Sequence, residues 1–416
     1  MAAAFAVAAS VLILAGCGGD KGEATPPTET VPAETGAPQE TAPPTTAPAE
    51  ATGEPIKVGA ISSITGPIPF PESTAAVQAV FDRVNAEGGI NGRPLEYLAE
   101  DDKADPALAG QASRRLVEEE GVVALVGSAS LLECSVNAQY YGEQNILSIQ
   151  GTGVDPVCFL APNISPVNTG PYLGITVGLY FASEVLKDEK ICAIMFSVAG
   201  LDEAVKAAVD RWSQITGKEI TFFDISLQPT DDPTPLAIRA KQKGCDAIVH
   251  NGLEPHGIAW AKALKTQGLD PAKDVDEISL TSMYTEKLAE ELGKAGIDGF
   301  YANSEFEPYL GDSPVLDDWR SLMAEAGVPP TSFAEGGYLA ATIFVDVLKG
   351  IDGEITRESV TQALRALEGY ESPLLGTPYS FGDAPTHNPN QASKFVRVEG
   401  GKWEVATPDW LILPSS

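Results

Sequence analysis

Residue types that carry out catalysis are sparse in this sequence. Of the three histidines, His250 and His256 lie six positions apart across a predicted turn, with no clear third ligand for a metal ion. Glu254 and His256 are an acid and a base close together, but they suit the polar start of a helix better. There is no Gly-x-Ser-x-Gly, P-loop or Cys-x-x-Cys motif. We therefore expect a protein that is not an enzyme and has no metal site and no cofactor.

Residues suited to binding a small molecule occur instead at the ends of predicted strands. Clusters of small polar residues follow three of them, at residues 62–67, 127–130 and 150–153. Ligands of open α/β sheets bind outside the carboxyl ends of the strands. Hydroxyl groups and free backbone N–H groups there suit a carboxylate or similar anion. Each single hydroxyl could equally cap a helix, but three clusters at one edge favour a binding site.

Alternating strand-like and helix-like segments must position these clusters. The apolar pattern predicts two successive α/β units, each with a parallel sheet, because crossovers of this length join parallel strands. The predicted strands lie at 56–62, 95–99, 122–126 and 146–149, and then at 191–196, 220–225, 246–250, 277–280 and 299–302. The predicted helices lie at 76–84, 106–120, 136–143, 171–186, 201–216, 236–243, 257–266, 286–292, 333–349 and 357–367. A hairpin is expected at 394–398 and 402–405, around Gly400 and Gly401.

Four of the five cysteines form an even set, which permits three pairings. Cys192 and Cys245 each begin a strand of the second unit, and these strands are neighbours in a sheet ordered 2-1-3-4-5. Cys134 and Cys158 both follow strands of the first unit. We therefore predict the disulfides Cys134–Cys158 and Cys192–Cys245.

The fifth cysteine, Cys17, ends a short apolar run and small residues, as in the lipobox of bacterial lipoproteins. We expect residues 1–16 to be a signal peptide and Cys17 to carry a lipid. Residues 17–55 are rich in Pro, Thr and Glu and predict a disordered tether. An ordinary signal peptide with an incidental cysteine is the alternative. The net charge of -31 argues against binding nucleic acid.

Several segments resemble the leucine/isoleucine/valine-binding type of periplasmic protein. They are residues 56–67, residues 85–96 with the following Asp101 and Asp102, residues 127–128 and 252–255, and Gly382. The resemblance covers roughly residues 56–405 and implies a type I solute-binding protein of ABC importers, here in lipoprotein form. It implies an α/β fold of two Rossmann-like lobes with parallel sheets, joined by a three-strand hinge. The implied chain crossings lie near 165–169, 303–305 and 376–380, with lobes at 56–168 plus 305–377 and 169–304 plus 378–416.

Few residues of this sequence match the positions that bind the amino acid in that family. Residues 131–133 and 153–154 fall where relatives hold the ligand with hydroxyl groups. Met283 and Tyr284 stand nearest to an expected acid, and Leu253 stands at an expected aromatic position. These departures put an α-amino acid ligand in question. The predicted ligand-binding residues are Phe70, Ser128, Ser130, Gly151, Thr152, Asn251, Tyr284 and Glu305.

The sequence therefore predicts a monomeric, lipid-anchored extracytoplasmic protein that captures a small polar solute by lobe closure. Amino acids, amides and small carboxylates are the expected solutes, and ABC permease subunits are the expected partners. A ligand-sensing receptor subunit that signals to a membrane partner is the alternative function. An envelope enzyme is a third interpretation, which would require turnover of the ligand.

Overall fold

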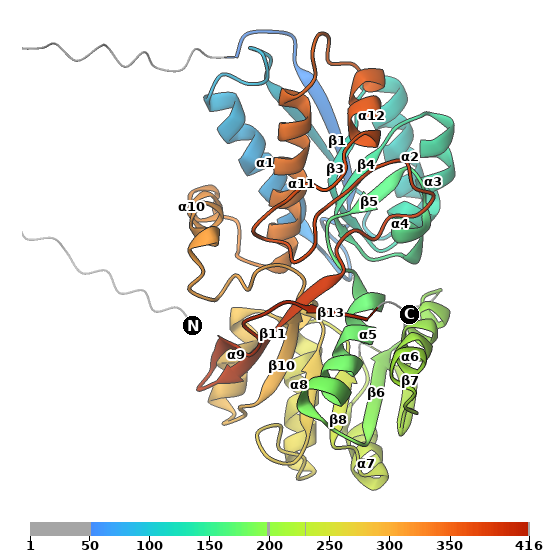
Figure 1. The fold of residues 1–416 in the computed structure, drawn as a ribbon, viewed down its shortest axis with the longest axis vertical. Coiled ribbons are helices and arrows are strands. Elements are labelled where there is room, and N and C mark those ends of the chain that lie inside the picture. The colour runs from blue at the N-terminus through green and yellow to red at the C-terminus, as the bar shows by residue number, and fades with distance from the viewer. Residues whose placement is uncertain (1–50, 198–199, 229, 415–416) are drawn as a thin grey trace, which may run out of the picture. The chain divides into compact units, whose positions relative to one another are not determined.

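The computed structural model describes residues 51–197, 200–228 and 230–414. The predicted signal peptide, Cys17 and most of the predicted tether lie outside these residues. The described residues belong to one compact unit, Pro48–Ser416, which contains two β-sheets with helices on both faces of each (Figure 1). Among the described residues, no helix is long and apolar enough to cross a membrane.

The first sheet is parallel throughout, with the strand order β2-β1-β3-β4-β5. Its strands are β1 Ile56–Ser62, β2 Leu95–Asp101, β3 Leu125–Ser130, β4 Ser148–Gly153 and β5 Ile164–Pro166. Strands β1, β3 and β4 are buried along almost their whole length, because helices cover both faces, as expected for continuous apolar runs.

Two groups of helices sandwich this sheet. One face packs against α1 and α11, and the other packs against α2 and α3. The helices around the sheet are α1 Pro71–Ala86, α2 Pro106–Arg114, α3 Glu133–Glu143, α4 Pro156–Leu160, α10 Asp317–Ala326, α11 Ser332–Lys349 and α12 Arg357–Arg365. The predicted helix 106–120 continues from α2 through the π-helical turn η1 Arg115–Glu119. Asp105 begins α2 by accepting hydrogen bonds from the backbone N–H groups of Ala107 and Leu108.

The second sheet is mixed, with the order β12-β11-β10-β9-β8-β6-β7, and β13 pairs with β11. The predicted α/β fold is confirmed, with five parallel strands in the order β7-β6-β8-β9-β10, and the predicted hairpin extends this sheet with antiparallel strands. Strand β11 pairs antiparallel with β10. A tight turn through Gly400 and Gly401, both with positive φ, then reverses the chain into β12, which pairs antiparallel with β11. The strands are β6 Ile191–Phe196, β7 Phe222–Leu227, β8 Ala247–His250, β9 Asp276–Ser279, β10 Phe300–Ser304, β11 Ala392–Glu399, β12 Lys402–Val405 and β13 Leu411–Ile412.

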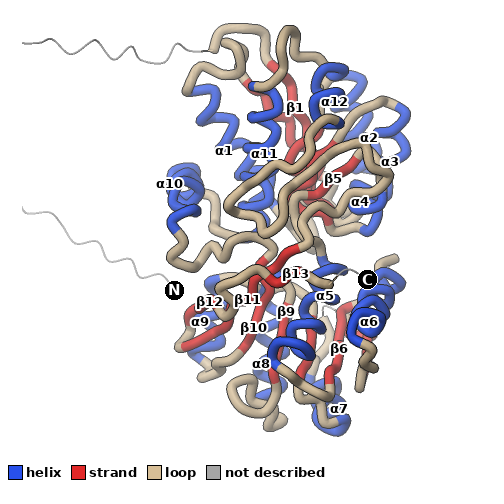
Figure 2. Tube along the Cα trace, in the orientation of Figure 1, coloured by secondary structure: helices blue, strands red, loops and turns tan. Residues whose placement is uncertain are grey.

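Helices again cover both faces of the second sheet (Figure 2). One apolar cluster joins α5 and α6 to it, and other clusters join α7, α8 and α9. These helices are α5 Pro171–Tyr180, which continues as the π-helical turn η2 Phe181–Leu186, α6 Asp202–Thr216, α7 Thr234–Lys243, α8 Glu254–Thr266 and α9 Glu286–Lys294. Short 3₁₀ turns occur at η3 Thr281–Met283 and η4 Pro314–Leu316. As expected, Glu254 begins a helix.

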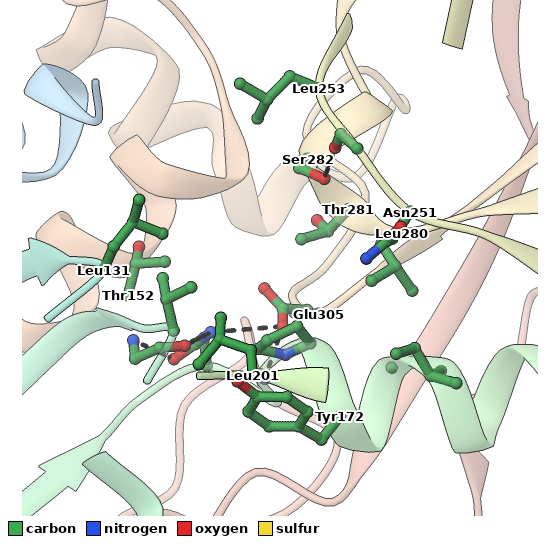
Figure 3. A pocket seen from close by; sticks show the side chains of 18 of the residues that line it. Leu131, Thr152, Tyr172, Leu201, Asn251, Leu253, Leu280, Thr281, Ser282 and Glu305 are labelled. Atoms are coloured by element: carbon green, nitrogen blue, oxygen red, sulfur yellow. Dashed lines mark hydrogen bonds between the residues drawn. The ribbon is translucent and has the colours of Figure 1, made fainter. Parts of the chain in front are cut away.

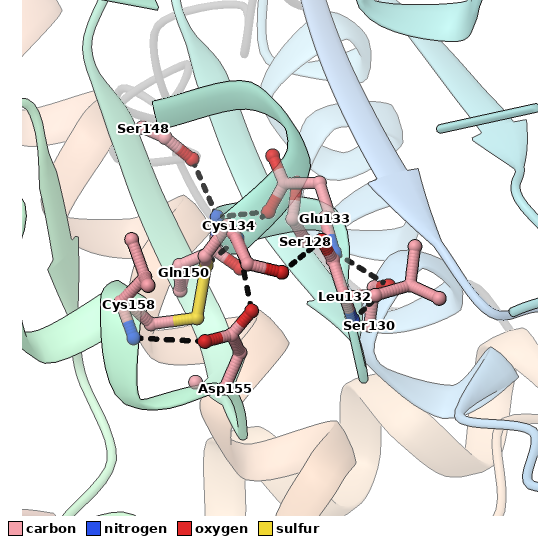
Figure 4. The surroundings of a disulfide bond; sticks show 12 residues. Ser128, Ser130, Leu132, Glu133, Cys134, Ser148, Gln150, Asp155 and Cys158 are labelled. Carbon is pink, nitrogen blue, oxygen red and sulfur yellow. Dashed lines mark hydrogen bonds between the residues drawn. A yellow bond between two sulfur atoms is a disulfide. The ribbon is translucent and has the colours of Figure 1, made fainter. Parts of the chain in front are cut away.

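Both predicted disulfides are present. Cys134 and Cys158 are joined near the carboxyl end of the first sheet, where Cys134 lies on α3 and Cys158 on α4 (Figure 4). Cys192 on β6 is joined to Cys245, two residues before β8 begins. The strand order 2-1-3-4-5, on which this second pairing was predicted, recurs in β7-β6-β8-β9-β10.

The chain connects the two sheets after β5, after β10 and before β11. The third connection differs from the crossing expected at 376–380. Tyr379 still pairs with Tyr370, and the backbone N–H of His387 donates to the carbonyl of Phe159 on α4, so this segment remains beside the first sheet. The passage to the second sheet follows at residues 388–391. These backbone hydrogen bonds at 379 and 387 hold the segment to the first sheet, and the resemblance did not reveal them.

Candidate functional site

A cavity of about 160 Å³ lies where the carboxyl ends of both sheets face each other. Its walls come from the loops after β1, β3 and β4 on one side and after β6, β8 and β9 on the other. Figure 3 shows Leu131 and Thr152 on one side, Asn251, Leu253, Thr281 and Ser282 on the other, and Glu305 between them. The remaining walls come from the start of α5, the end of β10 and the first turn of α11.

The lining is largely apolar. Phe70, from the loop before α1, meets Phe333 of α11 edge to face, with ring centroids 5.1 Å apart. This contact holds the two rings in a fixed orientation relative to each other, although their elements are far apart in sequence. Further apolar groups in the lining are Ile68, Leu131, Val154, Ile175, Phe196, Leu201, Val205, Leu253 and Leu280.

Glu305 is the acidic residue of the lining, and it is 3% exposed. Its Oε1 accepts hydrogen bonds from the backbone N–H of Gly170 at 2.7 Å and from Nδ2 of Asn168 at 3.4 Å. Gly170 has φ of 84°, and a Cβ there would lie 2.2 Å from the ring of Phe159, so only glycine fits this position. Burial raises the pKa of the Glu305 carboxyl to about 7, although these two hydrogen bonds lower it.

Glu305 also belongs to a set of bonds that ties the three inter-sheet connections together. Asn390, in the third connection, donates from Nδ2 to the carbonyls of Val167 and Glu305 at 3.2 and 2.9 Å. Asn168, in the first connection, exchanges two hydrogen bonds with the backbone of Gly153 at the end of β4. The cavity floor is therefore built from the segments on which any relative motion of the sheets would depend.

Four of the eight predicted ligand-binding residues line the cavity: Phe70, Thr152, Asn251 and Glu305. Oδ1 of Asn251 accepts from the backbone N–H of Phe196 at 2.6 Å, which fixes its side chain at the edge of the second sheet.

The other four predicted residues do not line the cavity. Ser128 Oγ accepts from the backbone N–H of Ile61 at 3.1 Å. Ser130 Oγ accepts from the backbone N–H groups of Leu132 and Glu133 at 3.1 Å each, and it donates to Asp102 (Figure 4). These hydroxyls are used to build the first sheet and its β3–α3 loop.

Gly151 and Tyr284 are likewise packing residues. A Cβ at Gly151 would lie 2.3 Å from Ser73 Oγ of α1, so glycine permits close approach of β4 and the helices. The ring of Tyr284 lies 4.3 Å from that of Tyr309, and its hydroxyl accepts from the backbone N–H of Leu310 at 3.0 Å. Thr281 and Ser282, just before Tyr284, line the cavity instead.

Several lining residues were missed from the sequence. Thr281 and Ser282 follow β9 directly, so the strand-end rule would have found them. Asn168 and Asn303 lie within the crossings that the resemblance implied, and Tyr172 lies on the first turn of α5, but nothing in their residue types marked them as lining residues. Phe333 comes from the start of a long helix, and only the fold brings it to Phe70.

The family model of the periplasmic binding proteins matches residues 55–402 of this chain. The chain belongs to this family. Proteins of the family are extracytoplasmic, non-enzymatic solute carriers, in agreement with the expectation that this periplasmic binding protein is not an enzyme.

Curated relatives are similar at a moderate level. The Leu/Ile/Val-binding protein of Escherichia coli is 27% identical over 251 residues, which are 57% of this chain and 66% of the relative, just under two thirds of its length. The leucine-, isoleucine-, valine-, threonine- and alanine-binding protein of Pseudomonas aeruginosa is 23% identical over 331 residues, which are 76% of this chain and 84% of the relative.

Solved structures share the fold. A branched-chain amino acid transporter substrate-binding protein from Streptococcus pneumoniae, in complex with isoleucine, matches with a TM-score of 0.71 at 18% identity, over 86% of this chain and 100% of that one. A solute-binding protein from R. palustris, in complex with 4-hydroxybenzoate, matches with a TM-score of 0.72 at 19% identity, over 87% and 98%. At these identities the likeness establishes the two-lobed type I fold of this periplasmic binding protein.

Proposed function

We propose that this periplasmic binding protein captures one small solute in the cavity between its two sheets and presents it to the permease of an ABC importer. The observation that carries the proposal is the cavity itself, lined by the carboxyl ends of strands from both sheets. A solute there would contact both lobes at once, so binding would favour their closed arrangement. The lobes proposed are residues 56–168 with 305–387 and residues 169–304 with 392–414. The protein is proposed to act as a monomer.

The lining favours solutes with a substantial apolar part. Small-molecule pockets bury most of the ligand surface, and here that surface would meet aliphatic and aromatic side chains. Relatives are named for binding leucine, isoleucine and valine, and one similar structure holds 4-hydroxybenzoate. All these molecules combine an apolar body with a polar end, which is the arrangement this cavity would accept.

A thermal-shift screen with amino acids, amines, amides and carboxylates tests this proposal. A solute that binds only the folded protein raises its melting temperature. Leu253→Trp, which puts an indole into the cavity, should abolish the shift. Ile238→Trp, an exposed position on α7, is the matched control and should retain it. A solute whose shift survives in Leu253→Trp would show that the protein does not bind it in this cavity.

Lipid anchoring through Cys17 completes the proposal, supported by the lipobox-like run that precedes this residue. The wild-type protein should fractionate with membranes when expressed in its own cell type. Cys17→Ser should be released, because a serine cannot carry the thioether-linked lipid. Equal membrane association of both proteins would overturn this part of the proposal.

A further inference from the structure

The cavity contains a buried carboxyl group without a cationic partner. Among the described residues, no lysine or arginine forms an ion pair with Glu305, and none lines the cavity. His256 lines it, but its Nδ1 accepts a hydrogen bond from the backbone N–H of Leu253, and an accepting nitrogen carries no proton. Isolated buried charges are costly, so such groups are normally paired. The hydrogen bonds from Asn168 and Gly170 both end on Oε1 of Glu305, whose side chain Figure 3 shows between the two walls of the cavity.

The same lining contains a further acceptor. Asn303, two residues before Glu305 on β10, is 1% exposed and lines the cavity, and its Oδ1 has no hydrogen-bond partner. The hydroxyl of Tyr172, on the first turn of α5, is buried in the same lining without a partner. Buried polar groups rarely lack a partner. The unpaired oxygen atoms in the lining therefore suit a ligand that donates several hydrogen bonds.

Several groups that would suit an anion, in contrast, already have hydrogen-bond partners. Ser128 and Ser130, which suited a carboxylate from the sequence, hold the β3 edge together. The backbone N–H of Gly153 donates to Asn168, and that of Gly170 donates to Glu305. Leu131 and Val154 occupy the neighbouring lining. A ligand carboxylate beside these groups would lose its hydration and gain no hydrogen bond from them.

We propose, on the basis of the solute-capture function above, that the ligand is a primary amine with an apolar body, whose ammonium group pairs with Glu305. The ammonium donates to Glu305 Oε2 and to Asn303 Oδ1. The apolar body packs against Phe70, Phe333 and Leu253. The ligand supplies the positive charge that the lining lacks, and its carbon skeleton needs no polar partners.

Two matched series test this class by isothermal titration calorimetry at pH 8. The aromatic series is 2-phenylethylamine, phenylalanine, 3-phenylpropanoate and 3-phenylpropanamide. The aliphatic series is 3-methylbutylamine, leucine, 4-methylpentanoate and 4-methylpentanamide. Within a series the body is constant and the polar end is a cation, a zwitterion, an anion or a neutral amide. In at least one series the amine should bind about tenfold or more tightly than the other three members.

Glu305→Gln isolates the charge, because glutamine retains an oxygen that accepts from Gly170. This variant should lose about tenfold or more of the amine affinity and change affinity for the amide by less than about threefold. Glu133→Gln is the matched control. Glu133 is also a fully buried glutamate, but it accepts from Tyr141 and Gln150 outside the cavity. Its substitution should leave amine binding unchanged.

Tighter binding of the acid or amino acid, or an amine preference that survives in Glu305→Gln, would overturn the inference. So would the absence of binding by every member of both series. In that last case a thermal shift with another solute, abolished by Leu253→Trp, would leave the proposed solute capture standing. Failure of every solute in the screen would instead remove the proposed function.

Discussion

Glu305 lines the cavity and also contacts two of the three inter-sheet connections. It is buried, it accepts hydrogen bonds from the first inter-sheet connection, and its carbonyl binds Asn390 of the third. A cationic ligand would restore the ionised form that burial disfavours. One residue thus joins the hinge segments, the cavity and the proposed ligand.

The raised pKa of Glu305 makes stability depend on pH. In the unfolded chain a glutamate has a pKa near 4.5, whereas burial raises the pKa of Glu305 to about 7. Between these pH values the folded state keeps a proton that the unfolded state has released, so the free energy of unfolding falls as pH rises. The shift corresponds to about 3 kcal/mol for this carboxyl. Glu335, a buried neighbour on α11 with a raised pKa, contributes in the same direction.

Glu305→Gln should therefore flatten the pH dependence. Between pH 5 and pH 8 it should lose about 3 kcal/mol less unfolding free energy than the ligand-free wild type, because glutamine does not ionise. Urea denaturation at both pH values measures this difference. Glu371→Gln, at an exposed position, is the control and should follow the wild type. Parallel wild-type and Glu305→Gln profiles would contradict the account.

Among the helices and strands, each disulfide links two elements of the same lobe. Cys134–Cys158 links α3 to α4 across 24 residues, and Cys192–Cys245 links β6 to the start of β8 across 53 residues. Neither pair contributes to the cavity lining. Their role is to restrict the unfolded chain and to hold neighbouring elements in place.

Removal of each disulfide should lower stability without changing the site. Loop-closure entropy predicts losses of about 3 kcal/mol for Cys134→Ala/Cys158→Ala and about 4 kcal/mol for Cys192→Ala/Cys245→Ala. Denaturation curves measure these losses. Ligand affinity at a temperature where each variant remains folded should stay within about twofold of wild type. Unchanged stability in both double variants, or a digest that links Cys158 to Cys192, would contradict the assignment.

Elements with clear periodicity were predictable from the sequence, and those defined by tertiary contacts were not. The strands from 56 to 302 and the helix 333–349 follow their apolar patterns, apart from small shifts at their ends. The short elements α4 and β5 and the helix α10 went unassigned. With five residues, α4 is too short to show a period, and β5 has only three residues. In α10, the buried Trp319, Leu322 and Met323 do follow a helical spacing, so this helix was within reach of the sequence.

Four of the eight predicted ligand-binding residues line the cavity, because topology predicts where a strand ends but not where its side chains point. Strand-end residues such as Thr152 and Asn251 follow from topology, because parallel strands deliver their carboxyl ends to one edge. The direction of a side chain at that edge does not follow from topology. Ser128 and Ser130 have the right residue type, but they donate to and accept from their own sheet and loop. Phe333 and Asn303 reach the cavity only because the chain crosses between the sheets three times.

The proposed function requires the whole molecule to enclose one solute between two lobes. Opposed sheet edges, a largely apolar lining and three hydrogen-bonded connections suit a receptor that closes on its ligand. Enclosure of the solute also predicts the sign of the heat-capacity change on binding. Apolar surface of the ligand and of both lobes leaves water together, which gives a negative heat-capacity change.

Titration calorimetry over several temperatures, with the solute that gives the largest thermal shift, measures whether the solute binds between the two lobes. We expect one site per chain, a negative heat-capacity change, and affinity at least about 100-fold weaker in Leu253→Trp than in wild type and Ile238→Trp. Equal affinity in all three proteins would show that the solute binds elsewhere and would contradict capture between the two sheets.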